Sequence, residues 1–207
     1  MKWVVGIDEV GRGALAGPVV VAAAMIAVDK TGQPKHIPFL GLKDSKKLSA
    51  HARVKWVNYF KSQANVRFAL ARVYPRGIER LNISAAANRA ALKALSQLSK
   101  KYDFPASTPI ILDGGLFLGS KTMQKGHKNA ITVVKGDKKF PAVAAASIIA
   151  KVSRDRFMVR LSKKYPAYGF EVHKGYGTTV HRRAIKKAGA CEAHRLTFLR
   201  LAPIIKG

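Results

Sequence analysis

The sequence predicts an α/β fold in which helices flank one mixed sheet and the chain ends in a small helical portion. Short apolar runs bounded by glycine or proline are typical of buried strands, and longer periodic segments are typical of helices. Strand patterns dominate early in the chain and helix patterns late, which favours a sheet flanked by helices. With 207 residues, of which 48% are hydrophobic, the chain is long enough to bury one core.

The first expected strand covers residues 3–7 and ends in two adjacent carboxylates, Asp8 and Glu9, followed by Gly11-Arg12-Gly13. A second apolar run over residues 19–28 is expected to pair with it as a hairpin. Acids are rare in this chain, with 11 Asp and Glu against 38 Lys and Arg. Two adjacent acids at a strand end therefore indicate a site that holds something positive.

Gly11 and Gly13 after a strand imitate the glycine fingerprint of dinucleotide-binding folds. That fingerprint requires a helix beginning at the glycines, whereas Gly17-Pro18 breaks a helix and a second strand follows. The adjacent acids would also repel a pyrophosphate. The segment from Gly114 to Lys121 likewise fails as a phosphate-binding P-loop, because Ser120 stands where that motif needs lysine.

The rest of the chain continues this pattern of strands and helices. Serine is a favoured residue immediately before a helix, and apolar side chains at helical spacing define a buried face. In chain order, we expect a helix over 50–62 capped by Ser49, a strand over 66–74, a helix from Ser84 to about residue 100 that buries Leu92, Leu95 and Leu98, strands over 109–113 and 130–134, and helices over 142–164 and 179–187.

Four acids share one position in this pattern: each lies at or just past the C-terminal end of an expected strand, close to a glycine. They are Asp8, Glu9, Asp113 and Asp137. If the strands are neighbours, these carboxylates meet at one edge of the sheet. Hard divalent cations such as Mg²⁺ or Mn²⁺ would relieve their mutual repulsion. For Asp137 a turn or helix-capping role is a competing interpretation, because aspartate is common at such positions.

The formal charge of +27 predicts a polyanionic partner, since the basic residues run along the whole chain. Acid-bound metals within such a surface indicate a nuclease, in which paired metals promote an in-line displacement. A non-catalytic nucleic-acid-binding protein is the other class that the charge permits, but it has no use for a carboxylate cluster facing its polyanion. Candidate phosphate contacts are Lys46, Lys47, Lys135, Lys138, Lys139 and Lys151.

Cellular location is indicated only indirectly. Cys191 is the only cysteine, so an intramolecular disulfide is impossible and a reducing compartment is the simplest expectation. No apolar run approaches the length that crosses a bilayer, and no signal-peptide pattern precedes the first strand. We therefore expect a cytoplasmic monomer with no membrane contact and no obligate protein partner.

Six motifs, in this order, resemble type 2 ribonuclease H (ribonuclease HII), and the match runs nearly end to end. They are Asp8-Glu9-x-Gly11-Arg12-Gly13, Asp44-Ser45-Lys46-Lys47-Leu48, Leu112-Asp113-Gly114, Lys135-Gly136-Asp137, the run from Ala145 to Val152 with Arg154-Asp155, and Gly175-Tyr176-Gly177-Thr178. The related ribonuclease HIII fits less well, because its corresponding segment usually lacks the arginine and it carries an extra N-terminal domain.

The resemblance implies a ribonuclease H-like catalytic domain over residues 1–164, with a substrate-contacting segment and helix over 165–207 packed on it. It implies two-metal hydrolysis of the RNA strand in RNA–DNA hybrids and cleavage 5′ of single ribonucleotides in duplex DNA, leaving 3′-hydroxyl and 5′-phosphate ends. The implied metal ligands are Asp8, Glu9, Asp113 and Asp137. The implied substrate contacts are Gly11, Arg12, Gly13, Lys46, Lys47, Ser147, Lys151 and Tyr176.

Three further expectations accompany the resemblance. For Tyr176 the competing interpretation is a core aromatic, which its two flanking glycines disfavour. Asp155, inside a long helix, is expected to form a surface ion pair. No sliding-clamp-binding peptide is recognised over residues 195–207.

Overall fold

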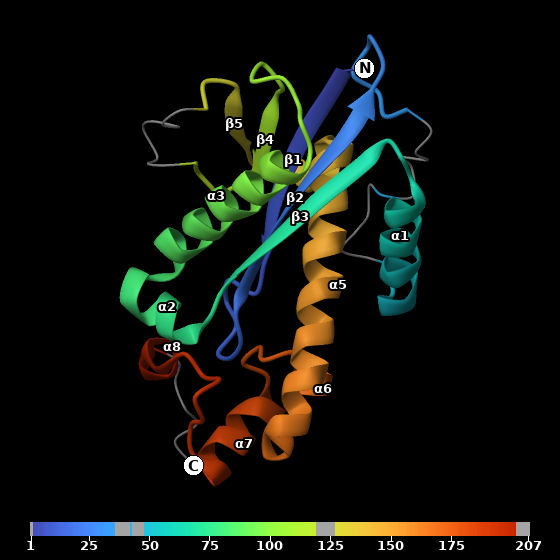
Figure 1. Ribbon diagram of the computed structural model, residues 1–207. Coiled ribbons are helices and arrows are strands. Elements are labelled where there is room, and N and C mark those ends of the chain that lie inside the picture. Colours follow the sequence, from blue (N-terminus) through green and yellow to red (C-terminus); the bar gives the residue numbers. More distant parts are fainter. Residues whose placement is uncertain (1, 36–41, 43–47, 119–126, 202–207) are drawn as a thin grey trace.

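The computed structural model describes residues 2–35, 42, 48–118 and 127–201 of the chain. Within these residues the chain forms a five-stranded mixed sheet with helices on both faces (Figure 1), which confirms the predicted fold class. The strand order is β3-β2-β1-β4-β5, with β1–β2 and β2–β3 antiparallel and β1–β4 and β4–β5 parallel. The strands are β1 (Lys2–Val10), β2 (Val19–Val28), β3 (Val66–Val73), β4 (Ile110–Asp113) and β5 (Ala130–Val133).

The helices divide between the two faces of the sheet. Helix α3 (Ile83–Lys101) packs on one face, whereas α1 (Ala50–Ser62) and the long α5 (Pro141–Lys164) pack on the other. The shorter elements are α2 (Pro75–Leu81), α4 (Gly136–Lys139), the 3₁₀ helix η2 (Pro166–Tyr168), α6 (Phe170–His173), α7 (Thr179–Ala188) and α8 (Leu196–Leu201). No helix in the described ranges is long and apolar enough to span a bilayer.

Side-chain alternation along the strands divides the core into two layers. In β1, Val5 and Ile7 pack toward α3, whereas Ala22 and Ala24 of β2 pack toward α5. Every residue of β2 is buried, because helices cover both faces of this strand. Gly6 lets α5 approach very closely, since a Cβ there would lie 2.1 Å from the Ala142 carbonyl carbon. This contact fixes the start of α5 against β1.

Strand β1 extends farther than the sequence predicted. Asp8 and Glu9 lie within the strand rather than after it, because residues 8–10 continue to pair with residues 22–20 of β2. β3 ends one residue earlier than predicted, at Val73, because Tyr74 is the N-cap of α2. Thus the site acids of β1 stand on regular strand backbone that is paired with β2.

Helix α3 corrects two expectations. Asn82, not Ser84, caps the helix, and its side-chain oxygen accepts a hydrogen bond from the Ala85 amide at 3.0 Å. Leu92 is 37% exposed, so its predicted burial was wrong. The buried stripe runs instead through small residues that allow close contact with the sheet, together with Leu95 and Leu98. Its members are Ala86, Ala87, Ala90, Ala91, Ala94, Leu95 and Leu98.

The segment from residue 165 onward packs against the loop that joins β1 to β2. The Leu15 amide donates to the Gly175 carbonyl and the Gly17 amide to the Ala193 carbonyl, both at 2.8 Å. The Arg195 amide donates to the Leu15 carbonyl, also at 2.8 Å. Figure 1 shows α6, α7 and α8 gathered at this end of the sheet, away from the N-terminus.

Candidate metal and nucleic-acid site

A hollow of about 410 Å³ lies beside the C-terminal ends of β1 and β4. Acids from these two strands, the glycine loop after β1, one side of α5 and the loop before α7 all contribute to its wall. The lining residues are Asp8, Glu9, Val10, Gly11, Arg12, Gly13, Asp113, Ser147, Ile148, Lys151 and Tyr176. All of them except Val10 and Ile148 are residues that the sequence predicted for the site.

Strand register brings the acids of β1 and β4 together. Ile7 pairs with Leu112 in the parallel β1–β4 ladder, so Asp8 and Asp113 both follow this pair on neighbouring strands. Asp113 Oδ1 accepts a hydrogen bond from the Gly136 amide at 2.7 Å. The predicted convergence of acids at one edge of the sheet therefore holds for these strands.

Some predicted site residues do not line this hollow in the described part of the chain. Asp137 is buried in the short α4, directly after Gly136, and does not line the hollow. Lys46 and Lys47 lie outside the described residues, so their predicted substrate contacts stay predictions. Lys135, Lys138 and Lys139 are exposed around α4.

Burial and like charge act together on the two acids of β1. Asp8 is only 4% exposed, and burial followed by the charges of Glu9 and Asp113 raises its pKa well above the ordinary value. Hydrogen bonds from the Ser147 hydroxyl and the Glu9 amide partly offset this rise. Burial also raises the pKa of Glu9, which Arg12 partly offsets. A bound cation would stabilise both charged carboxylates.

Arg12 connects the glycine loop to the acids and to α3. Its Nη1 lies 3.3 Å from Glu9 Oε1 and donates to the Gly115 carbonyl, also at 3.3 Å. Its Nη2 donates to the Ser84 hydroxyl at 2.9 Å. Ser84, which the sequence predicted as a helix cap, therefore holds Arg12 instead.

The acids of the hollow fit hard divalent cations. Glu9 Oε2 is buried and has no hydrogen-bond partner among the described residues, so one carboxylate oxygen has no protein donor. In the described ranges no three His, Cys, Asp or Glu side chains form a ready-made metal cage. Mg²⁺ commonly binds through one or two carboxylates, with substrate phosphates and water completing its shell. Asp8, Glu9 and Asp113 have the oxygen chemistry that this mode requires.

Two fully buried arginines hold the glycine loop. From the sequence, Arg154 was named only within a family motif, and neither arginine was given a role. Arg154 donates to the carbonyls of Ala16, Pro18 and Lys174 at 2.8–3.0 Å. Arg195 donates to those of Gly11, Arg12 and Gly17 at 2.7–3.1 Å. Burial, and then the charge of Arg154, lower the pKa of Arg195 to about 9, so it remains charged at neutral pH. Carbonyl dipoles rather than carboxylates surround these cations, which no local sequence pattern reveals.

Gly11 has no room for a side chain beside these arginines. Its φ is +85°, in the left-handed region, and a Cβ there would lie 2.1 Å from Arg154 Nε. A Cβ at Gly13, by contrast, would meet nothing within 4 Å. The first glycine is therefore needed for the loop itself, and the second leaves open space beside the hollow.

Tyr176 is half-buried and lines the hollow, so it is not a core aromatic. The Arg154 guanidinium lies 5.2 Å and the Lys151 ammonium 5.9 Å from its ring centroid, within cation–π range. Lys151 Nζ also pairs with Asp155 Oδ1 at 2.8 Å, which confirms the expected ion pair. These contacts place a phenol and a cation in the same hollow as the acids.

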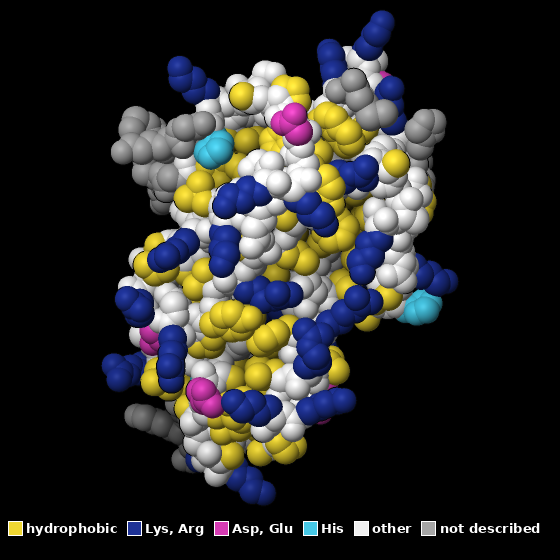
Figure 2. Space-filling view, in the orientation of Figure 1, with side chains coloured by type: hydrophobic (Ala, Val, Ile, Leu, Met, Phe, Trp, Pro, Cys, Tyr) yellow, Lys and Arg dark blue, Asp and Glu magenta, His cyan; other side chains and the backbone are white. Residues whose placement is uncertain are grey.

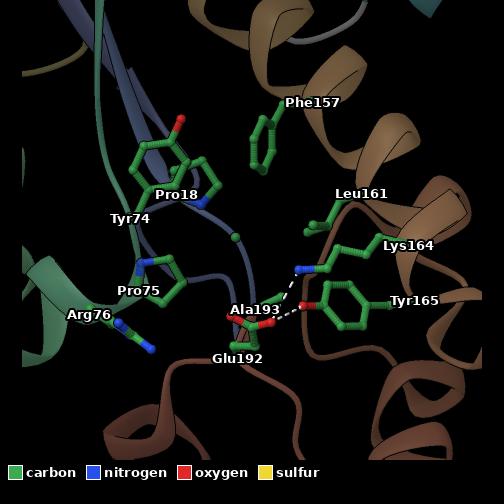
Figure 3. A pocket seen from close by; sticks show the side chains of 11 residues that line it. Pro18, Tyr74, Pro75, Arg76, Phe157, Leu161, Lys164, Tyr165, Glu192 and Ala193 are labelled. Carbon is green, nitrogen blue, oxygen red and sulfur yellow. Dashed lines mark hydrogen bonds and ion pairs between the residues drawn. The ribbon is translucent and has the colours of Figure 1, made fainter.

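A second hollow, of about 330 Å³, lies between the start of α2 and the end of α5 (Figure 3). The rings of Tyr74 and Phe157 approach across it with centroids 5.9 Å apart. Its single acid, Glu192, accepts from Lys164 Nζ at 3.1 Å and from the Tyr165 hydroxyl at 2.8 Å. One carboxylate that is already bound by two donors does not make an alternative metal site.

Comparison with known proteins identifies the family. The family model described as Ribonuclease HII matches residues 5–201. The chain belongs to the ribonuclease HII family. This confirms the prediction from the motifs and makes the protein an endonuclease of the hydrolase class. The ribonuclease HII of Ruminiclostridium cellulolyticum is 40% identical over 199 residues, covering 96% of this chain and 71% of that protein. That of Prochlorococcus marinus is 41% identical over 194 residues, covering 94% of each.

Solved structures of ribonucleases HII and HIII share the fold. Ribonuclease H2 from Pyrococcus horikoshii has a TM-score of 0.72 at 27% identity, covering 97% of this chain and 96% of that one. The Archaeoglobus fulgidus RNase HII, solved in a complex with PCNA, has a TM-score of 0.71 at 26% identity and covers 93% of each chain. Bst-RNase HIII in complex with Mn²⁺ has a TM-score of 0.70 at 24% identity, covering 98% and 70%, a likeness that shows the fold alone.

Proposed function

We propose that this ribonuclease HII hydrolyses the RNA strand of RNA–DNA hybrids and cuts 5′ of single ribonucleotides embedded in duplex DNA. It depends on two divalent cations, Mg²⁺ or Mn²⁺, and leaves 3′-hydroxyl and 5′-phosphate ends. The observation that carries the proposal is one hollow lined by three acids, a glycine-rich loop and Tyr176, on a chain with a charge of +27.

The basic surface supports a nucleic-acid duplex as the substrate. Figure 2 shows Lys and Arg side chains spread over the whole visible face, with few acids among them. Such a surface attracts a phosphate backbone without reading sequence. A protein that only bound duplexes would share this surface, but a cluster of three acids in one hollow has no use in binding a polyanion.

In the proposed reaction, Asp8, Glu9 and Asp113 hold the cations, and Asp137 supports them from α4. Paired divalent cations, when bound, activate the attacking water and stabilise the leaving oxygen in an in-line displacement. Ser147 orients Asp8 through its hydrogen bond. Arg12 restrains Glu9 through Oε1, which leaves Oε2 as the oxygen without a protein donor.

Sugar recognition is assigned to the glycine loop and Tyr176. The backbone of Gly11-Arg12-Gly13 can approach a ribose closely, because glycine carries no side chain. The Tyr176 ring offers a flat surface and a hydroxyl that can bond the 2′-hydroxyl, the group that separates a ribonucleotide from its DNA neighbours. Lys151, beside that ring, is suited to a neighbouring phosphate.

An end-labelled DNA duplex containing one ribonucleotide tests the function directly. Wild type should cut it once, on the 5′ side of the ribonucleotide, with Mg²⁺ or Mn²⁺ and not with EDTA. Direct resealing of the nick by DNA ligase, without prior treatment of the ends, would identify the 3′-hydroxyl and 5′-phosphate. Matched controls are an all-DNA duplex, which should stay whole, and a long RNA–DNA hybrid, which should be cut. Binding of all three duplexes without any cleavage would replace the nuclease with the non-catalytic binder.

We further propose that the protein acts as a cytoplasmic monomer without an obligate partner. A single cysteine and the absence of membrane-spanning helices in the described ranges are consistent with this placement. The PCNA complex belongs to the Archaeoglobus protein. Because residues 202–207 lie outside the described part of the chain, the expectation of no clamp-binding peptide stays a prediction. Light scattering with and without a sliding clamp tests both statements.

A further inference from the structure

Three buried histidines lie in a row behind Tyr176. His173 of α6, His181 of α7 and His194 are at most 8% exposed. The ring centroids of His173 and His181 are 4.2 Å apart and those of His181 and His194 are 5.3 Å apart, with both pairs stacked. The six histidines of the sequence thus include three that are packed into one cluster.

Hydrogen bonds fix the proton position on each of these rings. The Tyr176 carbonyl can only accept, so His181 Nδ1, at 3.0 Å from it, must carry a hydrogen. The other nitrogen of a neutral His181 is then an acceptor, and it lies 3.1 Å from His194 Nε2, which must donate. His194 Nδ1 is left as an acceptor, and the Cys191 amide donates to it at 3.0 Å.

His173 is fixed in the same way. Its Nδ1 accepts from the Gly175 amide at 3.1 Å, so its Nε2 donates to the Tyr168 carbonyl at 2.7 Å. His173 therefore holds the Gly175 amide, just before Tyr176, and His181 holds the carbonyl of Tyr176 itself. A proton added to Nδ1 of His173 or to Nε2 of His181 would meet an N–H group already directed at that nitrogen.

Few opposite charges compensate a proton in this cluster. Around His181, the charged or titratable neighbours are Arg182 on its own helix and the other two histidines. A positive charge on any of them disfavours protonation of His181. Around His173, Glu171 favours protonation and Lys174 opposes it. Around His194, the Cys191 carbonyl, 3.3 Å from Nδ1, favours protonation and His173 opposes it. Burial is the largest effect on all three rings.

We propose that His181 is a positioning residue for Tyr176, and that the three histidines hold the tyrosine loop only while all three rings are neutral. His194 acts through His181: because His194 Nε2 donates to Nε2 of His181, the hydrogen of the His181 ring stays on Nδ1. This inference rests on the proposed role of Tyr176 at the ribose. It concerns the tyrosine's support and leaves the acids untouched.

The ring tautomers provide a test that needs no substrate. At neutral pH, ¹⁵N-detected imidazole spectra of the wild-type protein should show His181 with hydrogen on Nδ1, and His173 and His194 with hydrogen on Nε2. Single substitutions assign the signals. A spectrum in which His181 carries hydrogen on Nε2, or is charged at neutral pH, would overturn the proposal whatever the nuclease assay gives.

Two substitutions separate the two bonds of His181. The amide nitrogen of an asparagine falls near Nδ1 and can still donate to the Tyr176 carbonyl, whereas the amide of a glutamine reaches toward Nε2. His181→Asn should keep kcat/KM at a lone ribonucleotide within about threefold of wild type, and His181→Gln should lower it by about tenfold, as expected for one lost hydrogen bond. Glu192→Gln, an exposed contact in the same C-terminal segment, is the matched control and should change nothing.

A double-substitution cycle distinguishes positioning from a general structural role. In a Tyr176→Ala background, His181→Gln should cause no further loss of kcat/KM, because the group it positions is gone. An equal loss in both backgrounds would overturn the proposal. If wild type cut no duplex at all, the proposed function would fail, while the tautomers would still decide how the histidines are arranged.

Discussion

The backbone amide of Gly136 donates a hydrogen bond to Oδ1 of Asp113 across 2.7 Å. It connects α4 to the end of β4 and occupies one oxygen of a proposed metal ligand. Asp113→Asn preserves this acceptor while removing the charge. It should therefore abolish most hydrolysis at saturating Mg²⁺ and leave the unfolding midpoint nearly unchanged. Activity assays and urea unfolding of the same preparation measure both effects.

Two companion variants complete that experiment. Asp113→Ala should lose the hydrogen bond as well as the charge, and so lose about 1 kcal/mol of stability in addition to activity. Asp103→Asn changes an exposed acid outside the hollow and should behave as wild type. Full activity of Asp113→Asn would remove this residue from the list of metal ligands.

Asp8→Asn should stabilise the metal-free protein. Because the pKa of Asp8 is raised in the folded state, its charge opposes folding at neutral pH, and a neutral amide removes that effect. Mg²⁺ or Mn²⁺ should raise the melting temperature of wild type by mass action, and raise that of the variant much less. Calorimetry with EDTA and with each metal measures both. Equal metal shifts in the two proteins would contradict the assignment of Asp8.

Arg195→Lys should destabilise the loop after β1 although it keeps the positive charge. An ammonium group cannot reproduce the fork of donors that binds the carbonyls of Gly11, Arg12 and Gly17, and buried acceptors left without donors cost about 1–3 kcal/mol. Chemical unfolding measures the loss. Arg200→Lys, on an exposed residue of α8, is the matched control, and an equal effect of the two substitutions would refute the explanation.

Tyr176→Ala should severely reduce cleavage at a lone ribonucleotide, because it removes both the ring and the hydroxyl from the wall of the hollow. Tyr176→Phe should lose less, since one hydrogen bond contributes about 0.5–1.5 kcal/mol net. Metal binding, followed by titration calorimetry, should be unchanged in both. If Tyr176→Ala cleaved as well as wild type, sugar discrimination would reside elsewhere.

Stability should fall as the pH drops from about 6.5 toward 4. Burial lowers the pKa values of His173, His181 and His194, that of His181 to about 4, so the unfolded chain binds protons in this window before the folded protein does. Asp8 acts in the opposite direction, because its raised pKa favours the folded state in acid. Melting temperatures from pH 7.5 to 4.5 should therefore decline less steeply in His181→Asn than in wild type. His51→Asn, on an exposed ring, should leave the slope unchanged.

Much of the fold could be predicted because its signals are local. The apolar runs of β1 and β2 and the Ser49 cap of α1 depend on neighbouring residues alone. Asn82 was missed as a cap because Ser84, two positions later, offers the same chemistry, and only the path of the chain decides between them. Helices α2, α4, α6 and α8 have 4–7 residues, too few to display a helical period.

The acids and the glycine loop could be predicted because scarce residues stand out in a basic chain. The arginines and histidines that hold these segments in place could not be predicted. Arg154 and Arg195 look like any of the 38 basic residues until the fold surrounds them with carbonyl groups. The histidines are likewise separated along the sequence, and their proton positions depend on backbone groups that only the folded chain brings together.

The bond between Arg195 and Gly11 joins residues that are 184 positions apart. During translation the strand that carries Asp8 and Glu9 leaves the ribosome long before Arg195 is made, an interval of roughly 10–40 s at ordinary elongation rates. Until then the loop after β1 lacks the cation that organises its carbonyls. A nascent chain therefore carries the acids before the loop beside them is fully held. The hollow that they line is completed only after the C-terminal segment has been made.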